Sequence, residues 1–251
     1  MSINLSEFKT ENAFFKGLIL GASNAGKTVA SITFPGKKLI LDFDNKVSSA
    51  AMFYQGQDIL KDVSVKQYGK VNIKSNTPTI KHRIQQFQDD MTPFIKMNEQ
   101  KQKLPFDTLI IDTITTLTDS LLEDYREVSL TGVKRPHKDQ NSQSDYGMLG
   151  TQFKMIMGKL LVMDANVIFL GHTELVQDKD SGIISNEILM PGKMASKLGI
   201  YFEEVYFAKL NSKNERVWQT QPDSKTKFCR TQRRNLPAEI PANYAEIVKA
   251  R

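Results

Sequence analysis

Short apolar runs alternate with longer stretches of helical periodicity through the first two thirds of the chain. The apolar runs predict strands at 14–20, 38–43, 108–111 and 167–170. Between and beside them, apolar residues recur every three or four positions, which is typical of amphipathic helices. The predicted helices are 27–34, 47–54, 79–97, 115–128 and 146–163. Strands that alternate with helices predict an α/β fold with a mostly parallel sheet covered by helices on both faces.

The last third of the chain has a different pattern. Residues 174–185 are polar and contain the turn signal Asp180-Ser181-Gly182. Three short stretches with strand character follow, at 205–210, 217–220 and 226–231. They predict an antiparallel C-terminal extension of the same sheet. We therefore expect an N-terminal segment, 1–13, followed by one domain, 14–251.

The most informative segment lies between the first predicted strand and the first predicted helix. Its sequence is Gly-Ala-Ser-Asn-Ala-Gly-Lys-Thr, a P-loop. The glycines allow successive amide groups to turn inward, and the start of the helix adds a positive dipole, so the loop suits the phosphates of ATP. A glycine-containing turn without a ligand is the alternative. The predicted nucleotide-binding residues are Gly21, Ala22, Ser23, Asn24, Ala25, Gly26, Lys27, Thr28 and Val29.

Two of these residues have further predicted roles, and acids at strand ends complete the site. Lys27 is expected to contact the β and γ phosphates, and the hydroxyl of Thr28 to ligate Mg²⁺. Asp112 closes the apolar strand 108–111 and is expected to hold the same Mg²⁺, although it can alternatively cap the next helix. Hydrolysis also requires a group that orients water. Asp42 and Asp44 both lie at the end of the neighbouring strand, and Asp44 is preferred.

Composition and charge narrow the class of protein. The 251 residues include 34 Lys and Arg against 28 Asp and Glu, which gives a net charge of +6. This excess suits nucleic acid as a partner, but it equally suits a surface that only keeps the protein in solution. Cys229 is the single cysteine, so an intrachain disulfide is excluded. The polar, acid-containing N-terminus and the lack of a long apolar run predict a cytoplasmic protein with no membrane association.

The P-loop, the strand end at 41–44 and the stretch 108–118 together resemble the ATPase core of the RecA and RadA recombinases. In that family an acid after the second strand is the catalytic base, which implies this role for Asp44, although the family residue is a glutamate. His172 stands where the family has its γ-phosphate sensor, usually a glutamine, and a histidine also donates hydrogen bonds. A polar residue in a loop is the alternative role for His172. The resemblance implies ATP and Mg²⁺ as cofactors and Lys27, Asp44 and His172 as catalytic residues.

The resemblance is closer to small phage-encoded RecA-like proteins that act as single-strand annealing recombinases. It covers 14–244, and the stretch 220–237 is its specific part. It implies an ATPase, stimulated by single-stranded DNA, that promotes annealing or homologous recombination as a filament or ring of identical subunits. The host would be a bacterium, in whose cytoplasm a single-strand-binding protein is a further candidate partner. The alternative is a slow nucleotide-gated loader or regulator in phage replication or packaging.

The resemblance also indicates where DNA and neighbouring subunits would bind. Recombinases place DNA-binding loops after the magnesium-strand helix and after the sensor strand, here 130–145 and 173–197. The candidate DNA-binding cations are Lys134, Arg135, Lys138, Lys193 and Lys197. Recombinase cores also place cations against the ATP of the adjacent subunit, which implies a trans-acting role for Lys225, Lys227 and Arg230. An ordinary solvated sheet edge is the alternative for these three residues.

Overall fold

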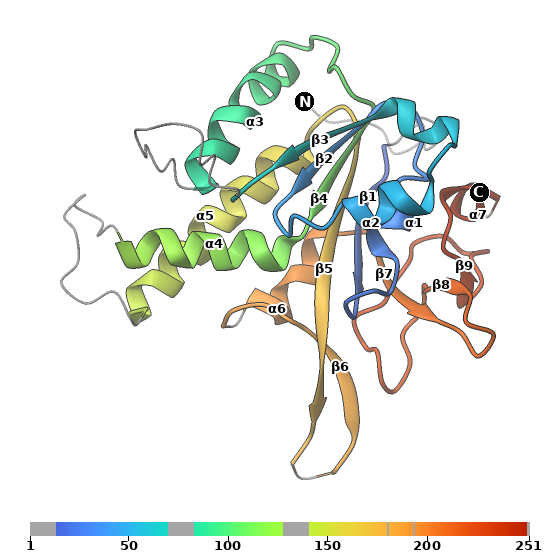
Figure 1. Cartoon of the computed structure of the whole chain (residues 1–251). Coiled ribbons are helices and arrows are strands. Elements are labelled where there is room, and N and C mark those ends of the chain that lie inside the picture. The colour runs from blue at the N-terminus through green and yellow to red at the C-terminus, as the bar shows by residue number, and fades with distance from the viewer. Residues whose placement is uncertain (1–13, 70–82, 128–140, 180, 193, 250–251) are drawn as a thin grey trace, which may run out of the picture.

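The computed structural model describes residues 14–69, 83–127, 141–179, 181–192 and 194–249. In this part of the chain a nine-stranded sheet has the order β3-β2-β4-β5-β1-β7-β8-β9, with β6 paired to β5 outside that path (Figure 1). The strands are β1 (Lys16–Gly21), β2 (Lys38–Asp42), β3 (Val63–Gln67), β4 (Thr108–Asp112), β5 (Asn166–Gln177), β6 (Ile184–Ile188), β7 (Glu204–Leu210), β8 (Arg216–Gln219) and β9 (Glu239–Pro241).

The six neighbouring strands β3, β2, β4, β5, β1 and β7 run parallel to one another. Strands β8 and β9 add antiparallel pairs beside β7. The predicted fold class, a mostly parallel sheet with an antiparallel C-terminal extension, is therefore confirmed. All five residues of β4 are buried, which explains its continuous apolar sequence, because a central parallel strand is covered on both faces. The register aligns Asp42 with Asp112 and Gly21 with His172. Several predicted site residues therefore lie along the same side of the sheet, at the carboxyl ends of β1, β2 and β4.

Helices cover both faces of the sheet (Figure 1). They are α1 (Lys27–Ser31), α2 (Ser48–Phe53), α3 (Arg83–Glu99), α4 (Ile114–Glu127), α5 (Gln143–Leu161), α6 (Met194–Leu198) and α7 (Tyr244–Lys249), with 3-10 turns at Asp58–Asp62 and Gly199–Tyr201. Alternation along β1 sends Leu18 and Leu20 into a core under α3, α4 and α5, and Ile19 into a core under α1, α2 and α7. Two hydrophobic layers thus hold the sheet between them.

Two predicted segments of the C-terminal third differ from the structure. Residues 174–185 were expected to be a polar loop, but β5 continues to Gln177 and pairs with β6 in a hairpin that extends away from the sheet (Figure 1). The predicted strand 226–231 is wrong, because it contributes only an isolated bridge between Val205 and Arg230. Polar residues alone did not distinguish a solvated hairpin from a loop, since both expose their side chains to water.

Candidate functional site

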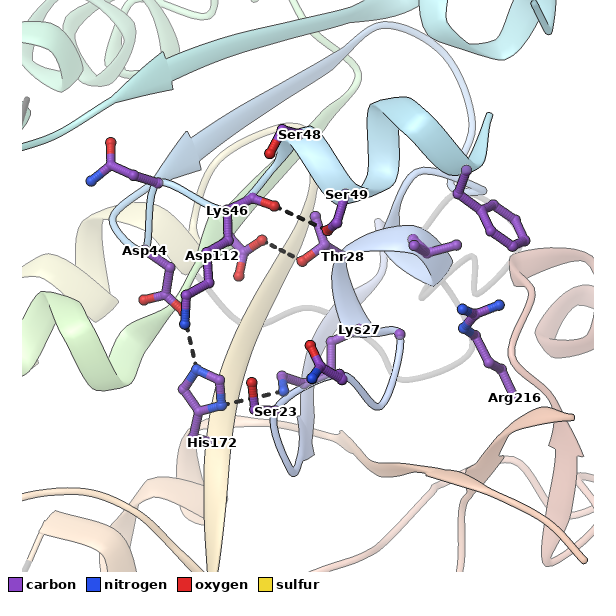
Figure 2. Close-up of a pocket in the computed structure, with 15 residues that line it drawn as sticks. Ser23, Lys27, Thr28, Asp44, Lys46, Ser48, Ser49, Asp112, His172 and Arg216 are labelled. Carbon is purple, nitrogen blue, oxygen red and sulfur yellow. Dashed lines mark hydrogen bonds and ion pairs between the residues drawn. The ribbon is translucent and has the colours of Figure 1, made fainter. Parts of the chain in front are cut away.

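A pocket of about 390 Å³ opens where β1, β2 and β4 end and β5 passes with His172 (Figure 2). Open α/β sheets bind ligands outside the carboxyl ends of their parallel strands. The P-loop joins β1 to α1 along one side of this pocket. Acids at the ends of β2 and β4 and the histidine of β5 lie opposite the loop, so residues far apart in sequence share one space.

The P-loop has the backbone geometry that its glycines permit. Gly26 caps α1 with φ 83°, a left-handed conformation that favours glycine, and Asn24 has φ 66°. The ammonium of Lys27 donates hydrogen bonds to the carbonyls of Gly21 and Ala22, at 2.9 and 2.8 Å. Burial lowers the pKa of Lys27 to about 8, against the opposing effect of nearby Asp112. The lysine therefore folds back onto its own loop.

Thr28 and Asp112 meet directly across the pocket. The hydroxyl of Thr28 donates a 2.6 Å hydrogen bond to Oδ2 of Asp112, which is itself buried. Burial raises the pKa of Asp112 to about 6, although the bond from Thr28 acts in the opposite direction. Hydroxyl and carboxylate oxygens are the ligands that Mg²⁺ prefers, and here they already lie within hydrogen-bond distance. The pair therefore fits a magnesium ion.

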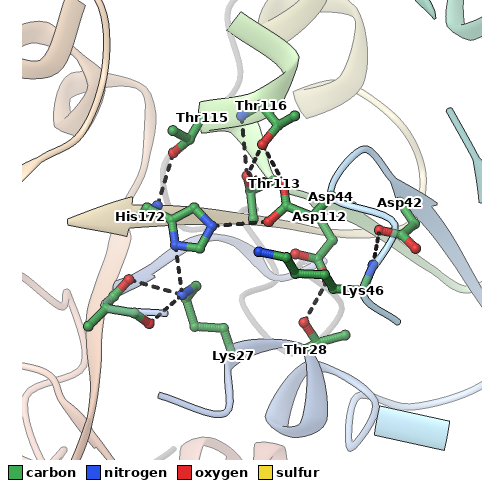
Figure 3. A network of polar contacts seen from close by, with 12 residues as sticks. Lys27, Thr28, Asp42, Asp44, Lys46, Asp112, Thr113, Thr115, Thr116 and His172 are labelled. Atoms are coloured by element: carbon green, nitrogen blue, oxygen red, sulfur yellow. Dashed lines mark hydrogen bonds and ion pairs between the residues drawn. The ribbon is translucent and has the colours of Figure 1, made fainter. Parts of the chain in front are cut away.

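Asp44 is the centre of a polar network that reaches the P-loop (Figure 3). Its Oδ2 lies 3.0 Å from Nε2 of His172, and the Nδ1 of that ring lies 3.4 Å from Nζ of Lys27. Its Oδ1 accepts hydrogen bonds from the hydroxyls of Thr116 and Thr113. Burial favours a raised pKa for Asp44, but the bonds from His172 and Thr116 outweigh it and hold the pKa below its ordinary value. Asp44 is therefore an ionised and fully engaged carboxylate.

Asp42 occupies a different environment. It is fully buried and accepts hydrogen bonds from the backbone amides of Lys46 and Val47 and from Nε2 of Gln67. These bonds hold the turn that leads into α2, and Asp42 does not line the pocket. Because β2 ends at Asp42, strand alternation does not extend to Asp44. The chain turns between the two acids and separates their side chains.

Of the predicted DNA-binding and trans-acting residues, those that the structure describes are not part of this pocket. Lys134, Arg135, Lys138 and Lys193 lie outside the described residues. Lys197 is exposed on α6, and Lys225 and Lys227 are exposed in the segment after β8. The guanidinium of Arg230 donates to the carbonyls of Gly199 and Phe202, so Arg230 links two parts of the fold.

Several residues that line the pocket were not identified from the sequence, and Arg216 is the one most distant from the P-loop along the chain. Arg216, the first residue of β8, lines the pocket close to the P-loop, together with Phe53 at the end of α2. The sequence carries no signal that relates Arg216 to the P-loop. Its position depends on the pairing of β1, β7 and β8, which brings the C-terminal strands beside the loop.

The family model that matches the sequence is described as an AAA domain, and it covers residues 13–227. The chain belongs to the AAA domain family. Membership supports a nucleotide-binding ATPase as the general class of this AAA-domain protein. With the observed sheet, it agrees with the predicted RecA-like P-loop fold. The closer resemblance to phage-encoded annealing proteins stays a prediction.

Among solved structures, the AAA-domain protein is similar to the one titled "Crystal structure of the RadB recombinase". The alignment has a TM-score of 0.44 and 12% sequence identity, and it covers 85% of this chain and 83% of that chain. No curated protein matches the sequence. Within the described ranges, the helices are too short or too polar to cross a membrane.

Proposed function

We propose that the chain is a Mg²⁺-dependent ATPase that assembles on single-stranded DNA and promotes annealing or homologous recombination. The observation that supports the ATPase is the convergence of five side chains on one pocket. They are Lys27, Thr28, Asp44, Asp112 and His172. A lysine and a hydroxyl on a P-loop, with two acids and a hydrogen-bond donor opposite, form the set that phosphoryl transfer to water requires.

Each residue has a distinct part in this proposal. Lys27 exchanges its bonds to the Gly21 and Ala22 carbonyls for bonds to the β and γ phosphates. Thr28 and Asp112 hold Mg²⁺, which would offset charge on the phosphates. Asp44 orients the attacking water at the end of the pocket. His172, which bridges Asp44 and Lys27, donates a hydrogen bond to the γ phosphate.

Charge outside the pocket supports DNA as the partner. The chain carries a net charge of +6, and exposed lysines at 197, 225 and 227 are free of the P-loop pocket. The β5–β6 hairpin itself is acidic in its described part, with Glu174, Asp178 and Glu187 against Lys179. We therefore expect the phosphate backbone to contact the cations near the base of the hairpin rather than its tip.

The test is steady-state ATP turnover with and without single-stranded DNA, in the wild-type chain and in Lys27→Ala. We expect DNA to raise the wild-type rate and Lys27→Ala to abolish turnover, because the lysine supplies the charge for the phosphates. Two results together contradict DNA as the partner. ATP turnover is unchanged by DNA, and no DNA is bound at low salt in the presence of a nonhydrolysable ATP analogue. No turnover under any condition contradicts the ATPase itself.

A second candidate function is a nucleotide-gated loader or regulator that turns ATP over slowly. The state of Asp44 favours it, because a carboxylate with a lowered pKa and three side-chain partners is a weak base. This candidate predicts a turnover below about 0.1 per second, under the usual range for enzymes. It also predicts that Lys27→Ala loses nucleotide affinity and retains DNA binding.

A further inference from the structure

The P-loop pocket has two chemically different ends. Asp44 and His172 lie at one end, and Arg216 lies on the other side of the P-loop (Figure 2). On the proposed function, which this inference requires, the terminal phosphate lies at the acidic end. The phosphate chain runs along the P-loop away from that end. The ribose and base, which are attached at the other end of the phosphate chain, therefore extend toward Arg216.

An exposed aromatic ring lies at this second end. Phe53 is 50% exposed, and the guanidinium carbon of Arg216 lies 4.7 Å from the centre of its ring. The arginine stem crosses the P-loop at Gly26, where an added Cβ would stand 2.3 Å from Cδ of Arg216. A planar guanidinium over a ring occupies the position that a planar base takes when it stacks on the same ring.

The ring is held in a fixed relation to the P-loop. Its neighbour Tyr54 packs edge-on against Phe53, with ring centres 4.9 Å apart. The hydroxyl of Tyr54 donates a 3.0 Å hydrogen bond to the carbonyl of Val29 on α1, the helix that the P-loop opens. The end of α2 is thus tied to the phosphate site, and a ring placed in advance costs little entropy when the ligand binds.

We propose that Phe53 and Arg216 form the base-binding end of the pocket. The base stacks on Phe53 in place of the guanidinium, and the displaced Arg216 turns toward the phosphates. Phe53 and Arg216 both line the pocket and lie in contact with each other, so a base that stacks on the ring takes the place of the guanidinium. Stacking recognises the flat face that adenine and guanine share, so adenine and guanine nucleotides should bind within about tenfold of each other.

The experiment compares the binding of ATP, GTP and inorganic tripolyphosphate, each with Mg²⁺, by calorimetry. Phe53→Ala should lower the affinity for ATP and for GTP by about tenfold, as expected for one lost stacking contact. It should leave the affinity for tripolyphosphate unchanged. Arg216→Ala should weaken all three ligands. Met52→Ala is the matched control, because Met52 is the preceding residue of α2, is 75% exposed and does not line the pocket.

Distinct outcomes separate this inference from the proposed function. If the wild-type chain binds neither ATP nor tripolyphosphate, the proposed function fails. If both bind, the base-binding assignment is overturned by either of two results. Phe53→Ala leaves the affinity for ATP unchanged, or it lowers the affinity for tripolyphosphate as much as the affinity for ATP. GTP affinity more than about a hundredfold below that of ATP overturns it too. Phe53→Trp should retain ATP affinity, since indole also stacks, and thermal unfolding of each variant confirms that it folds.

Discussion

At the scale of single residues, Asp42 and Asp44 have separate tasks in the structure. Asp42 is the last residue of β2, and Asp44 lies in the turn that follows it. Asp44 lines the pocket with His172, whereas Asp42 is buried under backbone amides. The sequence placed both acids at the end of one strand. The hydrogen bonds show that only Asp44 faces the space where a nucleotide would lie.

This difference yields a paired prediction. Asp44→Asn should lower ATP turnover at least about 100-fold, the usual effect of a lost catalytic base, with little change in nucleotide affinity. Asp42→Asn should instead lower the melting temperature, because it weakens the bonds to the Lys46 and Val47 amides. The measurements are turnover and thermal unfolding for both variants. Normal turnover in Asp44→Asn would remove Asp44 from the mechanism.

Asp112 gives a prediction about pH. Its pKa in the folded protein is about 6, above the ordinary value of 3.8, so between these two pH values the folded protein binds more protons than the unfolded chain. The contribution of Asp112 to stability is thus complete below about pH 4 and is lost as the pH rises through 6. Without Mg²⁺, the free energy of unfolding of the wild type should fall by on the order of 2 to 3 kcal/mol, relative to that of Asp112→Asn, between pH 4 and pH 7.5.

Denaturant unfolding of both proteins across this range measures the effect, since other titrating groups cancel in the difference. A constant difference would show that Asp112 does not hold its proton in the fold. Adding Mg²⁺ and ATP at pH 7.5 should stabilise wild type more than Asp112→Asn, because a ligand stabilises only the form that binds it.

At the scale of elements, Arg230 connects the segment after β8 to the turn Gly199–Tyr201. Its guanidinium bonds the carbonyls of Gly199 and Phe202, and its backbone pairs with Val205. A residue so engaged has a structural task that the sequence did not indicate. The trans-acting role, which stays a prediction, is then better assigned to Lys225 and Lys227, whose side chains take no part in this contact.

The prediction is that Arg230→Ala lowers the free energy of unfolding by about 1 to 2 kcal/mol, since it removes charged donors from two carbonyls. Arg234→Ala is the control, because Arg234 is an exposed arginine only four residues further along the chain. Denaturant unfolding measures both variants. Turnover that is lost in oligomers of Arg230→Ala alone, and partly restored when Lys27→Ala subunits are mixed in, would with unchanged stability instead support the trans-acting role for Arg230.

At the scale of the whole molecule, the net charge of +6 predicts DNA binding that weakens steeply with salt. Replacing Lys197, Lys225 and Lys227 by Gln should reduce the slope of log affinity against log salt by about 2, at about 0.7 per phosphate contact on single strands. The matched control replaces three exposed lysines in surface ion pairs, Lys61, Lys101 and Lys249. Equal slopes in both triple variants would contradict a local DNA contact.

Most of the parallel core could be predicted from the sequence, because buried strands and amphipathic helices leave strong local patterns. The same was true of the P-loop, whose phosphate chemistry depends on consecutive residues. Shorter elements at the periphery, such as β3, β9 and α7, escaped prediction. They are short and partly exposed, so their stability comes from the elements they pack against rather than from their own pattern.

The sequence by itself determined the phosphate loop, the alternating architecture and the acids that close the apolar strands. The tertiary structure decided which acid enters the pocket, that Arg216 and Phe53 line it, and that β5 continues to Gln177 and pairs with β6. Backbone conformation and burial periodicity depend on neighbours along the chain, which the sequence lists directly. The meeting of β8 with the P-loop depends on the register of β1, β7 and β8, which only packing fixes.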